Sequence, residues 1–107
     1  MEIKQYQVVL VDLNPTRGSE IQKTRPCLVI SPNEMNKYLQ TIIVAPMTTS
    51  LKNYPTRIPV VHNKKKGAVA IDQIRTIDKS RILKTFGTIT KKEIELCKRV
   101  LKETLVD

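Results

Sequence analysis

Short apolar runs, each bounded by turn residues, alternate along most of the chain. Valine, isoleucine and threonine dominate these runs, and proline, glycine or asparagine stands at their ends, a pattern typical of β-strands. The pattern predicts strands over residues 7–13, 27–31, 41–45, 57–61, 68–77 with a possible break, and 83–89. Several short strands at such spacing indicate a small antiparallel barrel or sandwich.

The segments between these runs are short and polar. Asn33, directly after Pro32, is a suitable cap for a short helical turn that extends toward Tyr38. Residues 47–55 are rich in threonine, serine and asparagine and are predicted to form a loop. The basic turn at residues 63–67 is predicted to be a solvated hairpin tip, with a phosphate clamp as the alternative.

The end of the chain changes to helical spacing. Thr90 and Glu93 stand three residues apart, the spacing of a capping box. Apolar side chains follow at steps of three and four residues: Ile94, Cys97, Leu101 and Leu105. This stripe predicts a C-terminal helix that packs on the strands. With 107 residues and no visible repeat or linker, we expect one domain over residues 1–107.

The chain carries a large excess of basic residues, and this excess bears on its function. Nineteen Lys and Arg residues against ten Asp and Glu give a net charge of +9. Solubility alone explains scattered lysines, but so high a charge on a short chain favours a polyanionic partner such as nucleic acid. The apolar runs are too short to cross a bilayer and the first residues do not form a secretion signal, so we expect a cytoplasmic protein.

Few residues are suited to binding a metal or a cofactor. Cys27 lies in an apolar run and Cys97 on the helical stripe, so both are expected to be buried thiols rather than a disulfide or a nucleophile. The single histidine, His62, is interpreted as a loop residue. These residues are too few for a Cys/His zinc site, and three separated glycines do not form a phosphate-binding loop. We expect neither a metal nor a cofactor.

Three polar stretches follow predicted strands, where functional loops usually lie. They cover residues 18–26, 46–50 and 72–78. Each has a plain structural explanation when it is taken singly. On that explanation, Gly18 and Pro26 would shape a turn, residues 48–50 would cap a loop, and Arg75 with Asp78 would form a surface ion pair.

Taken together, the stretches resemble the MazF/PemK family of bacterial toxins over the chain from Tyr6 to Leu105. The motifs that carry the resemblance are Leu13-Asn14-Pro15, Gly18-Ser19-Glu20, Thr24-Arg25-Pro26, Val29-Ile30-Ser31, Val44-Ala45-Pro46-Met47-Thr48 and Asp72-Gln73-Ile74-Arg75-Thr76-Ile77-Asp78. The resemblance implies a mainly β fold with α: an SH3-like antiparallel barrel with a C-terminal helix, acting as a homodimer. It also implies the toxin of a type II toxin–antitoxin system, a sequence-specific endoribonuclease (mRNA interferase) restrained by a cognate acidic antitoxin of the MazE type.

The resemblance further implies a mechanism that needs no metal. The 2′-hydroxyl of single-stranded RNA attacks the adjacent phosphate and leaves a 2′,3′-cyclic phosphate and a 5′-hydroxyl. By resemblance, Arg25 and Thr48 are the catalytic residues. The Arg25 guanidinium suits the stabilisation of charge on the phosphate, and the Thr48 hydroxyl suits a hydrogen bond to a phosphate oxygen. This pair leaves the proton acceptor open, because an arginine stays protonated.

The sequence departs from one branch of the family. The Kid/PemK branch has an Arg-x-Asp pair in the third stretch, where this chain has Ala70-Ile71-Asp72, and Ser19 replaces that branch's histidine in the first loop. Asp72 is therefore kept as a possible base or as a group that contacts an RNA base. By resemblance, the residues that line the RNA groove are Ser19, Glu20, Thr49, Ser50, Asp72 and Gln73.

Two other functions are compatible with such a fold. The CcdB toxins share the scaffold but bind DNA gyrase, and a gyrase-binding surface has no need of Arg25 and Thr48. A non-catalytic RNA-binding module is the other alternative. It is weakened by the shortage of aromatic side chains on which bases stack, since the chain has one Phe and three Tyr.

Overall fold

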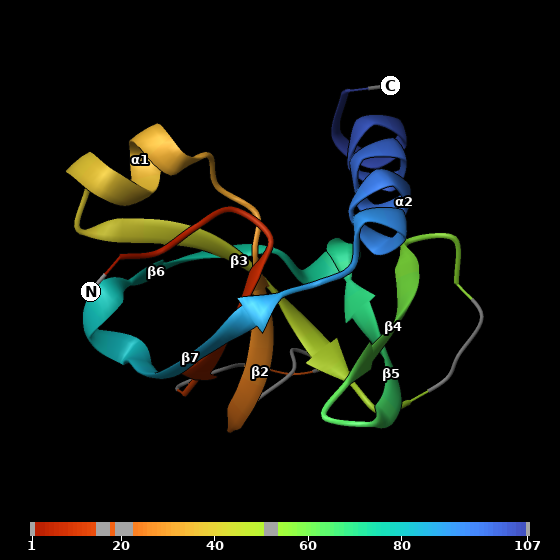
Figure 1. Cartoon of the computed structure of the whole chain (residues 1–107), viewed down its shortest axis with the longest axis horizontal. Helices are drawn as coiled ribbons and strands as arrows, with labels where there is room; N and C mark the ends of the chain where they lie inside the picture. The colour runs from red at the N-terminus through yellow and green to blue at the C-terminus, as the bar shows by residue number, and fades with distance from the viewer. Residues whose placement is uncertain (1, 15–17, 19–22, 51–53, 107) are drawn as a thin grey trace.

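The computed structural model describes residues 2–14, 18, 23–50 and 54–106, and its strands form a mostly antiparallel half-barrel with a helix at the C-terminal end (Figure 1). The strands are β1 (Gln7–Asp12), β2 (Thr24–Val29), β3 (Thr41–Thr48), β4 (Arg57–His62), β5 (Lys65–Ala70), β6 (Arg75–Asp78) and β7 (Ile82–Thr88). They follow the order β4-β5-β3-β2-β1-β7, with β6 beside β3. The helices are α1 (Asn33–Tyr38) and α2 (Lys91–Leu101), with short 3₁₀ turns η1 (Ile71–Gln73) and η2 (Lys79–Arg81). The mainly β prediction with a C-terminal helix is confirmed.

Strand β3 joins the two parts of the sheet. Its first residues pair with β6, its middle pairs with β2, and its last two pair with β5. The sequence predicted that this strand ends at residue 45, but it continues through Pro46 to Thr48. Proline lacks an N–H and is tolerated where the ladder does not need one. Pro46 is the last residue of β3 that pairs with β2, and Met47 is the first that pairs with β5.

Strand β2 also begins earlier than predicted. The sequence indicated a polar loop through Arg25 and a strand from residue 27, but the strand starts at Thr24. Arg25 pairs with Val11 and Pro26 with Leu10 of the neighbouring β1. The arginine therefore stands on a strand with fixed register rather than in a loop.

The sheet buries apolar side chains on both faces, because successive residues of a strand point to opposite sides. The helix-side cluster contains Val8, Leu28, Ala45, Met47, Ile58, Val60, Val69 and, from α2, Cys97 and Val100. The second cluster contains Ile3, Val9, Val11, Leu13, Cys27, Val29, Ile42, Val44, Ile77 and Ile82. Each large aliphatic side chain that is buried in this way stabilises the fold by about 1.5–3 kcal/mol.

Both thiols lie in these clusters, as predicted. Cys27 and Cys97 are free and buried. Burial raises the pKa of the Cys27 thiol to about 12 and that of the Cys97 thiol to about 11, because an apolar environment disfavours a thiolate. The two thiols therefore act as small apolar side chains.

Helix α2 begins with the predicted capping box. The Thr90 hydroxyl accepts from Glu93 N at 3.2 Å, and the Glu93 carboxylate accepts from Thr90 N at 2.9 Å. The helix ends at Leu101, and the chain continues as the wider π turn η3 (Lys102–Val106). That change of pitch turns Leu105 away from the stripe, and it is 57% exposed. The prediction that Leu105 packs on the core is wrong.

Helix α1 forms where predicted but without the predicted cap. Asn33 is the first helical residue, and its Oδ1 accepts from Gln5 N at 2.8 Å instead of from the helix. Behind it, the buried Asn36 donates from Nδ2 to Ser31 O at 2.9 Å. Among the described helices, none combines the length and the apolar character that a membrane span requires.

Candidate active site

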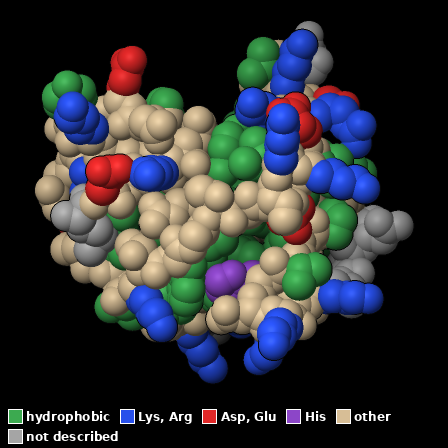
Figure 2. All heavy atoms as spheres, viewed as in Figure 1, with side chains coloured by type: hydrophobic (Ala, Val, Ile, Leu, Met, Phe, Trp, Pro, Cys, Tyr) green, Lys and Arg blue, Asp and Glu red, His purple; other side chains and the backbone are tan. Residues whose placement is uncertain are grey.

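A cavity of about 250 Å³ opens between the sheet and the β4–β5 hairpin. Side chains from several strands line it, among them Arg25, Thr48, Thr49, His62, Lys65 and Phe86. Figure 2 shows this side of the molecule, with the histidine in a hollow and Lys and Arg side chains along the lower rim. The cavity thus combines an apolar wall with a basic edge.

The register of the sheet brings Arg25 and Thr48 together. Cys27 of β2 pairs with Pro46 of β3, and the two strands are antiparallel. Arg25 and Thr48 lie two residues beyond this pair on their own strands. Both side chains are half-buried and line the cavity. Two residues that the sequence placed in separate loops therefore stand on adjacent strands and line one cavity.

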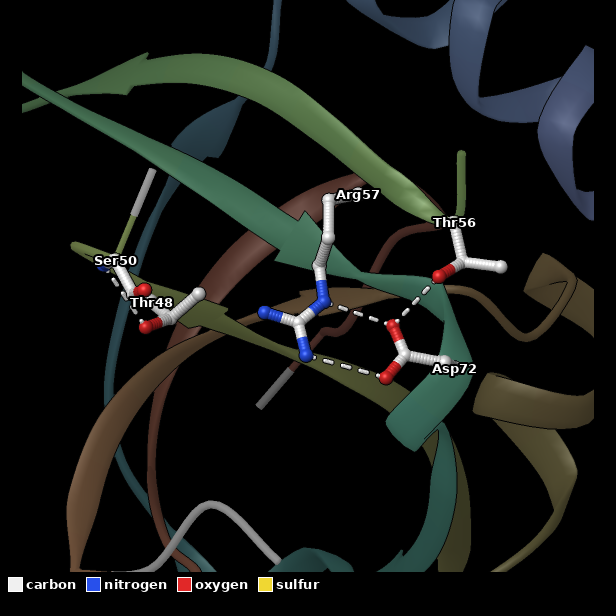
Figure 3. A network of polar contacts seen from close by, with 5 residues as sticks. All are labelled: Thr48, Ser50, Thr56, Arg57 and Asp72. Atoms are coloured by element: carbon white, nitrogen blue, oxygen red, sulfur yellow. Dashed lines mark hydrogen bonds and ion pairs between the residues drawn. The ribbon is translucent and has the colours of Figure 1, made fainter. Parts of the chain in front are cut away.

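Thr48 ends its strand in a local turn. Its hydroxyl oxygen accepts a hydrogen bond from Ser50 N at 3.1 Å (Figure 3). This contact fixes the hydroxyl oxygen at the point where β3 ends. Thr49 and Ser50 follow and are exposed, and Thr49 also lines the cavity.

Asp72 lies in η1, after β5, and is held by Arg57 (Figure 3). Arg57 donates from Nε at 2.8 Å and from Nη2 at 3.2 Å to the two carboxylate oxygens, and the Thr56 hydroxyl donates at 3.0 Å. The hydrogen bonds from Arg57 hold the pKa of the Asp72 carboxyl below its usual range, and the same pairing raises the pKa of Arg57. Asp72 is thus an ionised partner of Arg57, and the residues that line the cavity do not include it.

The other residues of the third stretch have separate positions. Gln73 is half-buried at the end of η1. Arg75 donates to Leu13 O at 3.1 Å, and the Asp78 carboxylate accepts from Ser80 N at 2.8 Å. Arg75 and Asp78 therefore hold two different backbone segments. Ser19 and Glu20 lie outside the described residues.

His62 is in β4, which corrects the interpretation of this residue as part of a loop. It is the last residue of the strand and pairs with Lys65 across a two-residue turn, Asn63 and Lys64. Both turn residues have positive φ, 52° and 62°, the combination that joins strands in a tight hairpin. The turn is therefore shorter than the predicted basic turn of residues 63–67.

The His62 ring points to the inner side of the hairpin, as Ile58 and Val60 do, since alternate residues share a face. It meets the Phe86 ring edge-to-face, with centroids 4.8 Å apart. Its Nε2 is buried and has no hydrogen-bond partner among the residues that the structure describes. Motif matching missed this residue, although the alternation of buried and exposed positions along β4 indicates it.

Within the described ranges, no three His, Cys, Asp or Glu side chains gather where they could hold a metal ion. The groups that meet at the cavity are instead a guanidinium, two ammonium groups, hydroxyls and one imidazole. Such a set binds phosphate and exchanges protons with it.

Comparison with known proteins identifies the family of the chain. Residues 4–105 match the PemK-like, MazF-like toxins of type II toxin–antitoxin systems. The chain belongs to this family. The family resemblance predicted from the sequence is confirmed. One relative, Endoribonuclease MazF of Staphylococcus epidermidis, is 36% identical over 86 residues, which cover 75% of this chain and 72% of that protein.

Solved structures of the family share the fold. MazF from Deinococcus radiodurans superposes with a TM-score of 0.87 at 23% identity, and the match covers 100% of this chain and 99% of that one. An endoribonuclease from a mycobacterial species, in complex with its cognate antitoxin, superposes with a TM-score of 0.82 at 22% identity over 97% and 95% of the two chains. At such identities the likeness establishes the half-barrel with its C-terminal helix.

Proposed function

We propose that this chain is a toxin that cleaves single-stranded RNA at the cavity between Arg25, Thr48 and the β4–β5 hairpin. The observation that carries the proposal is that Arg25 and Thr48, on the adjacent strands β2 and β3, line the same cavity. Membership of the toxin family and the endoribonuclease activity named for the staphylococcal relative support it.

The reaction uses a nucleophile that belongs to the substrate. The 2′-hydroxyl of one nucleotide attacks the next phosphorus, the bond to the 5′-oxygen breaks, and a 2′,3′-cyclic phosphate and a 5′-hydroxyl result. The Arg25 guanidinium stabilises the negative charge that develops on the phosphate oxygens, since its planar donors match their geometry. The Thr48 hydroxyl donates to a phosphate oxygen and orients the attack. No metal is required for these steps.

Residues around the cavity bind the RNA chain on either side of the cleaved bond. Lys65 and Lys66 line the cavity and are exposed, so they are placed to neutralise phosphates. Thr49 and Ser50 follow the catalytic threonine, and Gln73 follows Asp72 in η1. These three side chains, with Asp72, Ser19 and Glu20, are proposed to contact the RNA.

The proposal includes two protein partners. One is a second copy of the chain, which gives a homodimer, and the other is an acidic antitoxin of the MazE type. A mycobacterial structure with the same fold holds its cognate antitoxin, and the charge of +9 on this chain suits an acidic partner.

The test is cleavage of a long single-stranded RNA by Arg25→Ala, with Arg99→Ala as the matched control. Arg99 is an exposed arginine on α2, so its loss removes the same charge away from the cavity. Arg25→Ala should cut about 100-fold more slowly or worse, because a lost charge-stabilising donor costs about 3–4 kcal/mol in the transition state. Arg99→Ala should cut at the wild-type rate.

Two further measurements test the chemistry. Cleavage should persist in excess EDTA, and a substrate with 2′-deoxyribose at the cleaved position should bind without being cut. Near wild-type cleavage by Arg25→Ala, or cutting of the deoxy substrate, would show that the proposed site or mechanism is wrong.

A further inference from the structure

We propose that His62 is the proton acceptor of the cleavage reaction, taking the proton from the attacking 2′-hydroxyl at the Arg25–Thr48 cavity. This inference rests on the proposed function and supplies the group that the Arg25–Thr48 pair leaves open. Three observations carry it: the position of the ring in the cavity, its unpartnered nitrogen, and the chemistry of its neighbours.

The first observation is the position of the ring. His62 lines the same cavity as Arg25 and Thr48, although it comes from the hairpin on the other side. Figure 2 shows the chain's single histidine in the hollow, between the wall and the basic rim. The edge-to-face contact with Phe86 supports the ring from one side. A phosphate held by Arg25 would therefore lie in the same cavity as the imidazole.

The second observation is the nitrogen without a partner. Buried polar atoms are almost always hydrogen-bonded, and an exception calls for an explanation. Among the described residues, the only buried side-chain nitrogen or oxygen without a partner is His62 Nε2. A half turn of the ring about its Cβ–Cγ bond exchanges Nε2 with Cε1 and keeps the space that the ring fills. The imidazole can therefore change which atom it presents without disturbing its contact with Phe86.

The third observation is that the neighbouring groups donate protons or keep them. Arg25, Lys65 and Lys66 line the cavity as cations, and the Thr48 hydroxyl is far too weak a base. The nearest described carboxylate of the predicted site, Asp72, is held ionised in its pair with Arg57. Of the described residues that line the cavity, His62 is the one with an imidazole, the side chain that most often serves as a general base.

Charged groups surround the hairpin end on several sides. They are Arg25 on β2, Lys65 and Lys66 on β5, Lys84 over the Phe86 ring on β7, and Glu93 of α2, which accepts from the neighbouring Val61 N. Their lysines and arginine attract the phosphate. Glu93 accepts its hydrogen bond from the backbone outside the cavity lining, so among the described residues that line the cavity His62 is the acceptor for the 2′-hydroxyl proton.

The step balances as follows for the RNA. Neutral imidazole takes the 2′-hydroxyl proton while the 2′-oxygen forms its bond to phosphorus. The bond from phosphorus to the 5′-oxygen breaks, and that oxygen leaves with a proton from water. The imidazolium then returns its proton to the solvent, which restores the enzyme and leaves a cyclic phosphate and a 5′-hydroxyl.

The test compares His62→Gln with Val61→Ala in the full-length protein. Glutamine retains a hydrogen-bonding amide near the ring position but does not transfer protons, whereas Val61 is exposed on the opposite face of the same strand. The single-turnover cleavage rate at saturating RNA should fall by about 100-fold or more in His62→Gln, the range of general base catalysis. Val61→Ala should match the wild type.

The pH profile separates proton transfer from a structural role. Because a general base must be in its neutral form to accept a proton, the wild-type rate should rise with pH, and His62→Gln should lack this rise. Binding of the uncleavable 2′-deoxy RNA should be within about threefold of wild type in both variants. Free imidazole added to His62→Ala should restore part of the rate, whereas added acetamide should not.

The outcomes distinguish this inference from the proposed function. If the wild type cuts RNA and His62→Gln cuts equally fast with the same pH profile, His62 is not the base. A slow His62→Gln that keeps the wild-type profile, with weakened binding of the 2′-deoxy RNA, would also overturn the inference. If the wild type does not cut RNA at all, the proposed function itself fails. To exclude misfolding, His62→Phe, which keeps the packing on Phe86, should unfold near the wild-type temperature and be as slow as His62→Gln.

Discussion

Gly67 and Thr48 approach so closely that the glycine has no room for a side chain. A Cβ at Gly67 would stand 2.8 Å from the carbonyl oxygen of Thr48, a distance that requires the backbone to move. Gly67 belongs to β5 and Thr48 ends β3, so this contact sets how near the hairpin lies to the end of β3.

Gly67→Ala should therefore push the hairpin away from Thr48. We expect a loss of about 1–3 kcal/mol in the free energy of unfolding, as for other overpacked sites. The loss in cleavage rate, expressed as a free energy of activation, should be larger than this loss of stability. Gly87→Ala is the control, because a Cβ there meets nothing within 4 Å. Thermal unfolding and the cleavage rate measure the two effects. Equal behaviour of the two variants would contradict the proposed effect of the close approach.

The Arg57–Asp72 pair should make stability depend on pH in the acid range. Its hydrogen bonds lower the pKa of Asp72 in the folded protein. The pair therefore stabilises the fold fully above the unfolded carboxyl pKa of about 3.9, and this contribution is lost as the pH falls through the lower folded value. Because the Asp72 side chain is 36% exposed, we expect about 1 kcal/mol or less at neutral pH.

Asp72→Asn measures this contribution. Its free energy of unfolding from urea titrations should be lower than that of the wild type at pH 7 and nearly equal at pH 2.5. A constant difference between the two proteins across this range would mean that the carboxylate is not the stabilising group.

Binding of RNA should weaken steeply with salt. A plot of the logarithm of the binding constant against the logarithm of the salt concentration should have a slope of about −3 if four to six phosphates are neutralised, since each contact releases counterions. Replacing both Lys65 and Lys66 with alanine should make the slope shallower by about 1.4. Lys98→Ala, on the exposed side of α2, is the matched control and should leave the slope unchanged. Fluorescence titration with 2′-deoxy RNA at several salt concentrations gives the slopes.

An acidic antitoxin segment should compete with RNA. A basic groove that holds an extended phosphate chain also suits an extended chain of carboxylates. A peptide from the acidic tail of the adjacently encoded protein should inhibit cleavage, and the inhibition should fade with salt. RNA and peptide should weaken each other's binding by the same factor. If the peptide binds tightly while RNA is still bound and cut, the antitoxin does not inhibit the toxin at this groove.

The sequence predicted those features that depend on residues close to one another along the chain. The start of α2 was predictable because Thr90 and Glu93 cap the helix within one turn. The prolines misled the prediction, because Pro26 and Pro46 resemble strand ends although each occupies a strand position that needs no N–H. The extent of these strands depends on pairing with partners far along the chain.

At the candidate site, too, sequence patterns identified some residues, whereas their arrangement depends on pairing between distant strands. Arg25 and Thr48 were named from family motifs, but their position on adjacent strands that line one cavity is a property of the sheet. His62 matched no motif and was assigned to a loop; its alternation with Ile58 and Val60 indicates the inner face, and the tight turn at Asn63 and Lys64 places it within the strand. A single histidine carries no spacing from which its surroundings can be inferred.

The central strands serve both hydrophobic clusters at once, and this has a consequence for cooperativity. In β3, Ile42 and Val44 belong to the second cluster, while Ala45 and Met47 belong to the helix-side cluster. Neither cluster can come apart without releasing a strand that the other needs, so the two should melt together as one unit. Arg25 and Thr48 stand on the strands that are held from both faces. Their alignment should therefore persist through the small local openings that fray the ends of the chain.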